Sequence, residues 1–252
     1  MKTLSSLFAI SVLFVNCNDS VLAQSDENRS IPSFTKIENS GPLDVVLEKG
    51  SKESVNVNIT GVDPRKVITE VDGTTLKVHM EKGSYFNLKG KITITYVNLT
   101  AISDMGSGDI TCTSDIEATA FSLSSRGSGD IRIEGKVKAT EFNFQHKGSG
   151  DVILSNLETR DLTLAMMGSG DFKAISGTAQ KQTIDLMGSG DVEIAGLAGE
   201  SCTVSIKGSG DVETNVSTSL QGNIMGSGNI SYKGDPKIRQ VELKGSGNVS
   251  KL

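Results

Sequence analysis

The sequence predicts an all-β protein: a right-handed parallel β-helix (solenoid) of about eight short rungs, with an irregular β cap at its N-terminal end. Three observations favour this fold: a tetrapeptide that recurs about every twenty residues, apolar and polar residues that alternate with a period of two, and an unusual composition. The 252 residues include 28 Gly, only 4 Pro and no Trp. Such a composition is typical of a chain with many tight turns and argues against a helical bundle.

The tetrapeptide Gly-Ser-Gly-Asp begins at positions 106, 127, 148, 168, 188 and 208, and Gly-Ser-Gly-Asn begins at 226 and 245. Successive copies start 18–21 residues apart. A fixed period of this length indicates a solenoid, in which each repeat stacks on its neighbours. The intervening segments, such as "ESCTVSIK" at 200–207, alternate polar and apolar residues. This alternation predicts strands and not helices.

Alignment of the repeats on their first glycine produces apolar columns, which we expect to stack inside the coil at a strand spacing of about 4.8 Å. Each buried side chain would contribute about 1.5–3 kcal/mol. The two longest columns are Ile110, Ile131, Val152, Phe172, Val192, Val212, Ile230 and Val249, and Leu123, Phe144, Leu164, Ile184, Val204, Gly222 and Val241. A right-handed coil is expected because parallel crossovers overwhelmingly take that hand. No proline occurs between Pro64 and Pro236, as centrally paired strands require.

Residues 31–104 lack the tetrapeptide but contain four alternating segments, "DVVLEKG", "SVNVNITG", "TLKVHM" and "KITITYV". We interpret them as irregular N-terminal strands that cover the open end of the coil, since an unpaired solenoid edge has to be hidden. The turn "VDGTTL" indicates a hairpin. Residues 31–252 are thus predicted to form a single domain, with the regular rungs at 105–252, and residues 24–30 are predicted to form a disordered linker.

Residues 1–23 are predicted to be a secretory signal peptide. Lys2 supplies a positive start, Leu4–Val15 is apolar, and "SVLAQ" offers a cleavage site after Ala23. The alternative is a lipoprotein whose mature N-terminus is a lipidated Cys17, but Asn16 stands where lipoprotein processing prefers a small residue. Both interpretations place the protein outside the cytoplasm, in the periplasm, in the outer membrane or at the cell surface. No later apolar run is long enough for a transmembrane helix.

The two remaining cysteines, Cys112 and Cys202, are predicted to be free thiols. They lie four rungs apart, roughly 19 Å at strand spacing. A disulfide requires Cα atoms within about 7 Å.

The tetrapeptide itself is interpreted as a sharp corner. Glycines allow positive φ and close stacking of rungs, and we expect each Asp or Asn to accept hydrogen bonds from its own turn, chiefly from a serine hydroxyl and a backbone amide. The acidic column is Asp109, Asp130, Asp151, Asp171, Asp191 and Asp211. A ladder of bound cations such as calcium is the less favoured alternative, because each turn supplies one carboxylate and a calcium site needs six to eight oxygens. No metal or cofactor is expected.

The repeated "GSGD" and "GSGN" corners, the ending "GSGNISYKGDPKIRQVELKGSGNVSKL" and the start "FTKIENSGPLDVVLEKGSKESVNVNITG" together resemble the head GIN domain of auto-transporter adhesins. The resemblance covers about residues 31–252. It implies a right-handed β-helix on an exported envelope protein of the Bacteroidetes type. The chain lacks a C-terminal run of membrane-barrel strands and a coiled-coil stalk, and these departures argue against self-export through a barrel.

The function classes can be narrowed further. The net charge of −5 and the lack of a basic stripe argue against nucleic-acid binding. His79 and His146 are interpreted as structural, and rungs of 18–21 residues leave no long loop to build a catalytic cleft. The protein is therefore predicted to be a non-catalytic module for binding, adhesion or scaffolding in the cell envelope, with an unknown ligand such as a glycan or an envelope protein. The alternatives are a carbohydrate-active β-helix enzyme and a structural module that self-assembles through its C-terminal rung. The sequence leaves the oligomeric state open.

Overall fold

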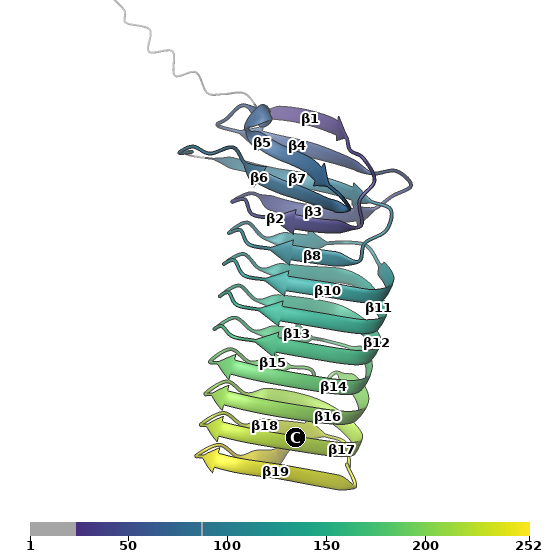
Figure 1. Cartoon of the computed structure of the whole chain (residues 1–252), viewed down its shortest axis with the longest axis vertical. Helices are drawn as coiled ribbons and strands as arrows, with labels where there is room; N and C mark the ends of the chain where they lie inside the picture. The colour runs from purple at the N-terminus through teal and green to yellow at the C-terminus, as the bar shows by residue number, and fades with distance from the viewer. Residues whose placement is uncertain (1–23, 87) are drawn as a thin grey trace, which may run out of the picture.

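The repeats coil into a straight ladder of parallel strands beneath an N-terminal cap, as the computed structural model in Figure 1 shows. The structure describes residues 24–86 and 88–252, so the predicted signal peptide and the lipidation site at Cys17 lie outside the described residues. The described strands join in one hydrogen-bonded network, and the regular helical element in this part of the chain is a single 3-10 turn, η1 (Pro64–Lys66). No helix within the described ranges is long and apolar enough to cross a membrane.

The coil has about eight turns, and its strands pair in parallel with strands one rung away. The rung strands are β8 (Ala101–Asp104), β9 (Ile110–Cys112), β10 (Ile116–Ser125), β11 (Ile131–His146), β12 (Val152–Met166), β13 (Phe172–Ala174), β14 (Gly177–Gly188), β15 (Val192–Glu193), β16 (Leu197–Gly208), β17 (Val212–Gly226), β18 (Ile230–Lys233), β19 (Ile238–Gly245) and β20 (Val249–Lys251). The longest of them, β11, β12 and β17, each pair with strands on two walls of the coil.

The predicted apolar columns are confirmed except in the last rung, where Val241 and Val249 are only partly buried. Ile131 pairs with Ile110 on one side and with Val152 on the other, and all three are at most 1% exposed. Phe144 packs against Phe172 with ring centroids 4.9 Å apart, so the interior is filled by side chains from both walls. This packing works because identical register in neighbouring rungs brings like positions into contact along the axis.

The cap is more regular than the sequence indicated. It consists of β1 (Ser25–Ser30), β2 (Lys36–Asn39), β3 (Asp44–Lys49), β4 (Ser54–Thr60), β5 (Val67–Asp72), β6 (Thr75–Met80) and β7 (Lys89–Tyr96). β2 and β3 form a first rung that pairs in parallel with β8 and β9. Above it, β4 pairs antiparallel with β7, and the predicted hairpin is present as β5 and β6.

The prediction of a disordered linker at residues 24–30 was wrong. Ser25–Ser30 form β1, which pairs antiparallel with β4 over its whole length. The guanidinium of Arg29 donates hydrogen bonds to the carbonyl oxygens of Val67 (2.6 Å) and Pro64 (2.8 Å). The polar composition of this segment was misleading because backbone hydrogen bonds hold an edge strand whose side chains stay half exposed.

Cys112 and Cys202 are free thiols, as predicted. Cys112 stacks on Ile133 and Cys202 on Leu220, and both are buried.

Candidate functional site

The corners explain the repeated glycines chiefly through close approach of the backbone. A Cβ atom on Gly127 would lie 1.9 Å from the carbonyl oxygen of Gly106, and one on Gly150 would lie 2.0 Å from that of Gly129. Positive φ values in the left-handed region occur in only half of the corners, at the first glycines 188, 208, 226 and 245. The expected need for positive φ therefore holds for those four glycines, whereas close stacking applies to both glycines of a corner.

The acidic column is held by hydrogen bonds between rungs, not within the turns. The backbone N–H of Asp151 donates to Oδ1 of Asp130 at 2.8 Å, and the N–H of Asp171 donates to Oδ1 of Asp151 at 2.9 Å. The series starts at Asp44, which accepts from the N–H of Asp109, and it continues to the asparagines at 229 and 248. The expected bonds from the serine hydroxyls to the carboxylates are not among those in the described corners. Stacking in register places the next amide directly over each carboxylate, and this geometry prevails over a bond within the turn.

These bonds offset the repulsion along the column. Unit charges about 4.8 Å apart repel by roughly 0.9 kcal/mol in water, and a hydrogen bond from an amide to a carboxylate is stronger than one to a neutral oxygen. Within the described part of the chain, no three His, Cys, Asp or Glu side chains are grouped so that they could hold a metal ion.

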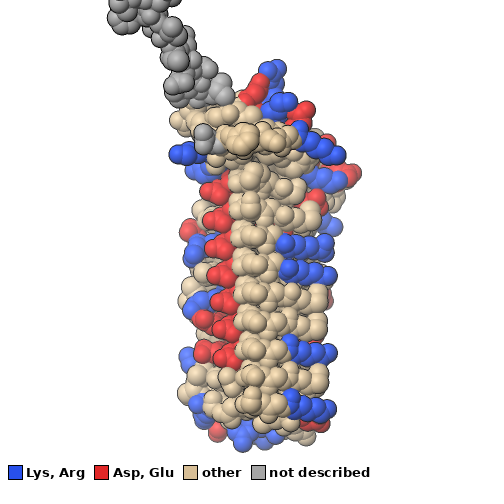
Figure 2. Space-filling model, turned by 90° about the vertical axis from the view of Figure 1, so that its left-hand side faces the viewer, with Lys and Arg blue, Asp and Glu red and all other residues tan. Residues whose placement is uncertain are grey.

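The corner face carries three parallel rows: the acidic row, the Gly-Ser row, and a row of methionines and cations. Figure 2 shows the acidic row in red, an uncharged strip beside it, and Lys and Arg at intervals on the far side of that strip. The third row is the position before each first glycine: Met105, Arg126, Lys147, Met167, Met187, Lys207, Met225 and Lys244. This row was not predicted from the sequence, although its signal was a residue type restricted to Met, Lys and Arg at one position of the repeat. Its four methionines are 36–42% exposed.

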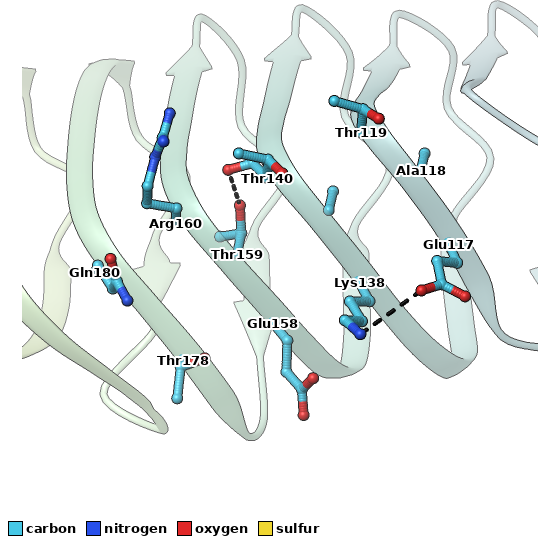
Figure 3. A pocket seen from close by; sticks show the side chains of 11 residues that line it. Glu117, Ala118, Thr119, Lys138, Thr140, Glu158, Thr159, Arg160, Thr178 and Gln180 are labelled. Carbon is cyan, nitrogen blue, oxygen red and sulfur yellow. Dashed lines mark hydrogen bonds and ion pairs between the residues drawn. The ribbon is translucent and has the colours of Figure 1, made fainter.

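A groove of about 730 Å³ lies on another wall, where β10, β11, β12 and β14 bend (Figure 3). Small residues form its floor, because Ala118, Ala139 and Thr159 occupy equivalent positions in three rungs. Two rows of polar side chains flank this floor. The rows are Glu117, Lys138, Glu158 and Thr178 on one side, and Thr119, Thr140, Arg160 and Gln180 on the other.

The charged side chains of the groove form exposed ion pairs, among them Glu158 with Lys136 Nζ at 2.8 Å. Lys138 Nζ lies 3.6 Å from Glu117 Oε1, and Arg160 Nε lies 2.8 Å from Oδ2 of the neighbouring Asp161. Exposed ion pairs of this kind contribute at most about 1 kcal/mol. A ligand can therefore replace them at little cost. The groove was not predicted from the sequence, since the bend that makes it hollow is set by the packing of whole rungs.

The two histidines do not form a catalytic site. His79 is partly exposed on β6, and its Nδ1 lies 3.0 Å from the carbonyl oxygen of Met80. His146 is 1% exposed and stacks on Phe144, and burial lowers the pKa of its imidazole. It continues a buried polar stack of Asn39, Asp104 and Ser125, one residue per rung.

The polar stack is beyond the reach of a substrate. Asp104 is fully buried and accepts a hydrogen bond from Asn39 Nδ2 at 2.9 Å, and desolvation raises the pKa of its carboxyl. Although Asp104, Ser125 and His146 are residue types known from hydrolase triads, they are stacked at rung spacing inside the core, not arranged around an open pocket.

Comparison with known proteins agrees with this architecture. A sequence model of the family described as "Putative auto-transporter adhesin, head GIN domain" matches residues 33–139 and 122–236. The chain belongs to this family. No curated protein matches it.

Solved structures with the same fold cover 91% of the chain. A putative adhesin from Parabacteroides merdae has a TM-score of 0.85 at 20% identity, with 96% of that chain covered. A putative adhesin from Parabacteroides distasonis has a TM-score of 0.83 at 21% identity, with 97% covered. A putative lipid binding protein from Parabacteroides distasonis has a TM-score of 0.81 at 26% identity, with 96% covered. The family and these neighbours fit an adhesion-type module.

Proposed function

We propose that the protein is an exported, non-catalytic adhesion module of the cell envelope, and that its ligand lies in the groove formed by the bends of β10, β11, β12 and β14. The observation that supports this is the groove itself, which repeats similar polar positions over four rungs above a floor of small residues. An extended ligand that runs along the coil would meet a new set of side chains at each rung.

The ligand class that fits this groove is a glycan. The two rows combine hydroxyl groups, an amide, carboxylates and cations, so they offer both donors and acceptors to the hydroxyl groups of a sugar chain. Neither sign of charge dominates, which disfavours a strongly acidic or strongly basic polymer. An extended segment of an envelope protein is the competing ligand.

Catalysis is not part of the proposal. The buried histidine and the stacked Asp104 and Ser125 lie beneath the corners, away from the groove. The groove itself is broad and open to solvent.

Binding can be tested with residues 24–252 on a glycan array. Matrix proteins and phospholipid vesicles are tested in parallel as other candidate ligands. The vesicles are included because one of the solved neighbours is called a lipid binding protein. For any ligand found, Lys138→Ala and Arg160→Ala together should weaken binding by about tenfold or more, equivalent to 1.4 kcal/mol. Ala118→Trp should also block binding by filling the floor.

Lys147→Ala is the matched control, because Lys147 is an exposed cation of the same coil on the corner face. If this control weakens binding as much as the groove variants do, the ligand lies elsewhere. Protease treatment of intact cells tests the proposed location: digestion supports the surface, and protection until the outer envelope is opened supports the periplasm.

A further inference from the structure

The last rung of the coil is open, in contrast to every rung above it. Leu243 on β19 stacks below Ile224, which is fully buried, yet Leu243 itself is 50% exposed. Val241 and Val249 occupy inward columns and are only partly buried. At the opposite end the first rung is covered by β4, β5, β6 and β7 and by the polar strand β1 (Figure 1).

The open end also carries free strand edges. In the described residues, β19 pairs with β17 alone and β20 pairs with β18 alone. The outer edge of each therefore presents backbone N–H and C=O groups to solvent. Such an edge is a template for a further strand unless the chain blocks it.

Side chains near this edge hinder the addition of a further strand only in part. Arg239 lies over Tyr232, with its guanidinium 5.9 Å from the ring centre and a hydrogen bond of 2.5 Å to the hydroxyl. Lys251 Nζ lies 3.3 Å from Asp235 Oδ1. Neither pair involves Leu243. The part of the rung next to the corner keeps the exposed Leu243, and an apolar patch with a polar border is typical of an interaction surface.

We propose that this end is an interface with a second copy of the chain, related by a two-fold axis, with β19 antiparallel to β19 of the other copy. An axis through Leu243 packs Leu243 against Leu243 of the partner subunit. In the same register, Glu242 faces Lys244 of the partner subunit, and the pair occurs twice by symmetry. The β19 side chains are thus self-complementary in charge, which supports a second copy over an unrelated partner.

The symmetry is also consistent with the capped N-terminal end. Head-to-tail stacking would create an open filament, but the antiparallel cap and the polar β1 do not continue the parallel rungs. A tail-to-tail pair is closed. It forms one long rod that displays two copies of the groove, and paired sites increase avidity when both can engage. The interface does not depend on what the groove binds.

The test is the oligomeric state of residues 24–252, measured by sedimentation over a wide range of protein concentration. We expect a monomer–dimer equilibrium. Glu242→Lys and Lys244→Glu should each raise the dimer dissociation constant by about tenfold, and the double variant should restore most of the wild-type affinity because it exchanges the two charges of each pair. Lys207→Glu, in the same column two rungs above, is the control and should leave the equilibrium unchanged.

Two further variants keep the test decisive. Leu243→Asp should give a folded monomer, since the side chain is already half exposed, and circular dichroism would verify the fold. Leu243→Cys should oxidise to a disulfide-linked dimer because the two residues meet at the axis. A monomer at all concentrations would overturn the proposal, and so would a dimer that is insensitive to Leu243→Asp and to the charge reversals.

Discussion

A glycine at the corner can be tested by giving it a methyl group, and Gly150→Ala is the sharpest case. The new Cβ would lie 2.0 Å from the carbonyl oxygen of Gly129 and 2.7 Å from its carbonyl carbon. Ordinary contacts to a Cβ are at least 3.0 Å, so two rungs would have to separate locally by about 1 Å.

That separation affects the bonds beside it. The bond from the N–H of Ile131 to the Asp151 carbonyl oxygen and the bond from the N–H of Asp151 to Asp130 Oδ1 are both 2.8 Å long. They would stretch to about 3.8 Å, beyond hydrogen-bonding range. Two lost hydrogen bonds destabilise the fold by about 0.5–1.5 kcal/mol each, and overpacking by about 1–3 kcal/mol. In the opposite direction, alanine lowers the conformational entropy of the unfolded chain, which stabilises the fold by about 0.4–1 kcal/mol. The net loss in the free energy of unfolding is about 3 kcal/mol.

Urea denaturation followed by circular dichroism measures this loss. Gly41→Ala is the control, because Gly41 is the counterpart of the first corner glycine in the first rung, where the nearest atom to a new Cβ is 3.7 Å away. We expect that variant to be unchanged or stabilised by up to about 1 kcal/mol. If Gly150→Ala and Gly41→Ala unfold at the same urea concentration, close approach of the rungs is not the reason for the glycines.

Four other predictions follow from the same structure. Millimolar calcium or a chelator should leave the melting temperature unchanged, and a rise of many degrees with calcium would show that the acidic column is a metal site. Deletion of residues 168–187 should give a shorter protein with β-type circular dichroism and a cooperative melt, because each rung contacts only its neighbours; loss of both would contradict the solenoid. Cys112 and Cys202 should react with a thiol reagent at about pH 8 only after denaturation, because both are buried and burial raises the pKa of Cys202 to about 12; fast reaction of the native protein would contradict the packing. Burial also raises the pKa of the Asp104 carboxyl in the folded protein above its value of about 3.9 in the unfolded chain. The ionised carboxyl therefore lowers the free energy of unfolding above the folded-state pKa, whereas below about pH 3.9 the carboxyl is protonated in both states and has no such effect. Asp104→Asn should therefore stabilise the protein at neutral pH, and denaturation curves at falling pH should show the gain shrinking towards about pH 4; a gain independent of pH would refute this assignment.

The fold could be predicted because two independent patterns require the same register. The period-two alternation places Ile131 inward, and the spacing of the corners places Ile110 and Val152 directly beside it. The strand at Ser25–Ser30 could not be predicted in this way. Its stability comes from backbone bonds to β4 and from the contacts of Arg29, and neither leaves an apolar pattern in the sequence.

The candidate site was less accessible to prediction, for a related reason. The direction of the Asp151 hydrogen bond depends on where the next amide lies, which is a property of the stacked rungs and not of the tetrapeptide. The groove depends on a bend shared by four strands. Ala118, Ala139 and Thr159 become its floor only when their rungs are placed side by side, although each is an ordinary residue in its own strand.

The repeated and the varied positions of this chain therefore serve different ends. Each ladder bond joins a side-chain oxygen of one rung to a backbone N–H of the next, so the series continues only if every rung carries Asp or Asn at that place, as from Asp109 to Asp211. The close approach of neighbouring backbones restricts the corner positions to glycine in the same way. Outward positions are free of this restriction, since their side chains do not support the next rung. The groove uses such positions: Glu117, Lys138, Glu158 and Thr178 stand at one place of the repeat and differ in charge from rung to rung. Recognition in a coil of this kind has to reside where the repeat is broken, because only those positions distinguish one rung from another.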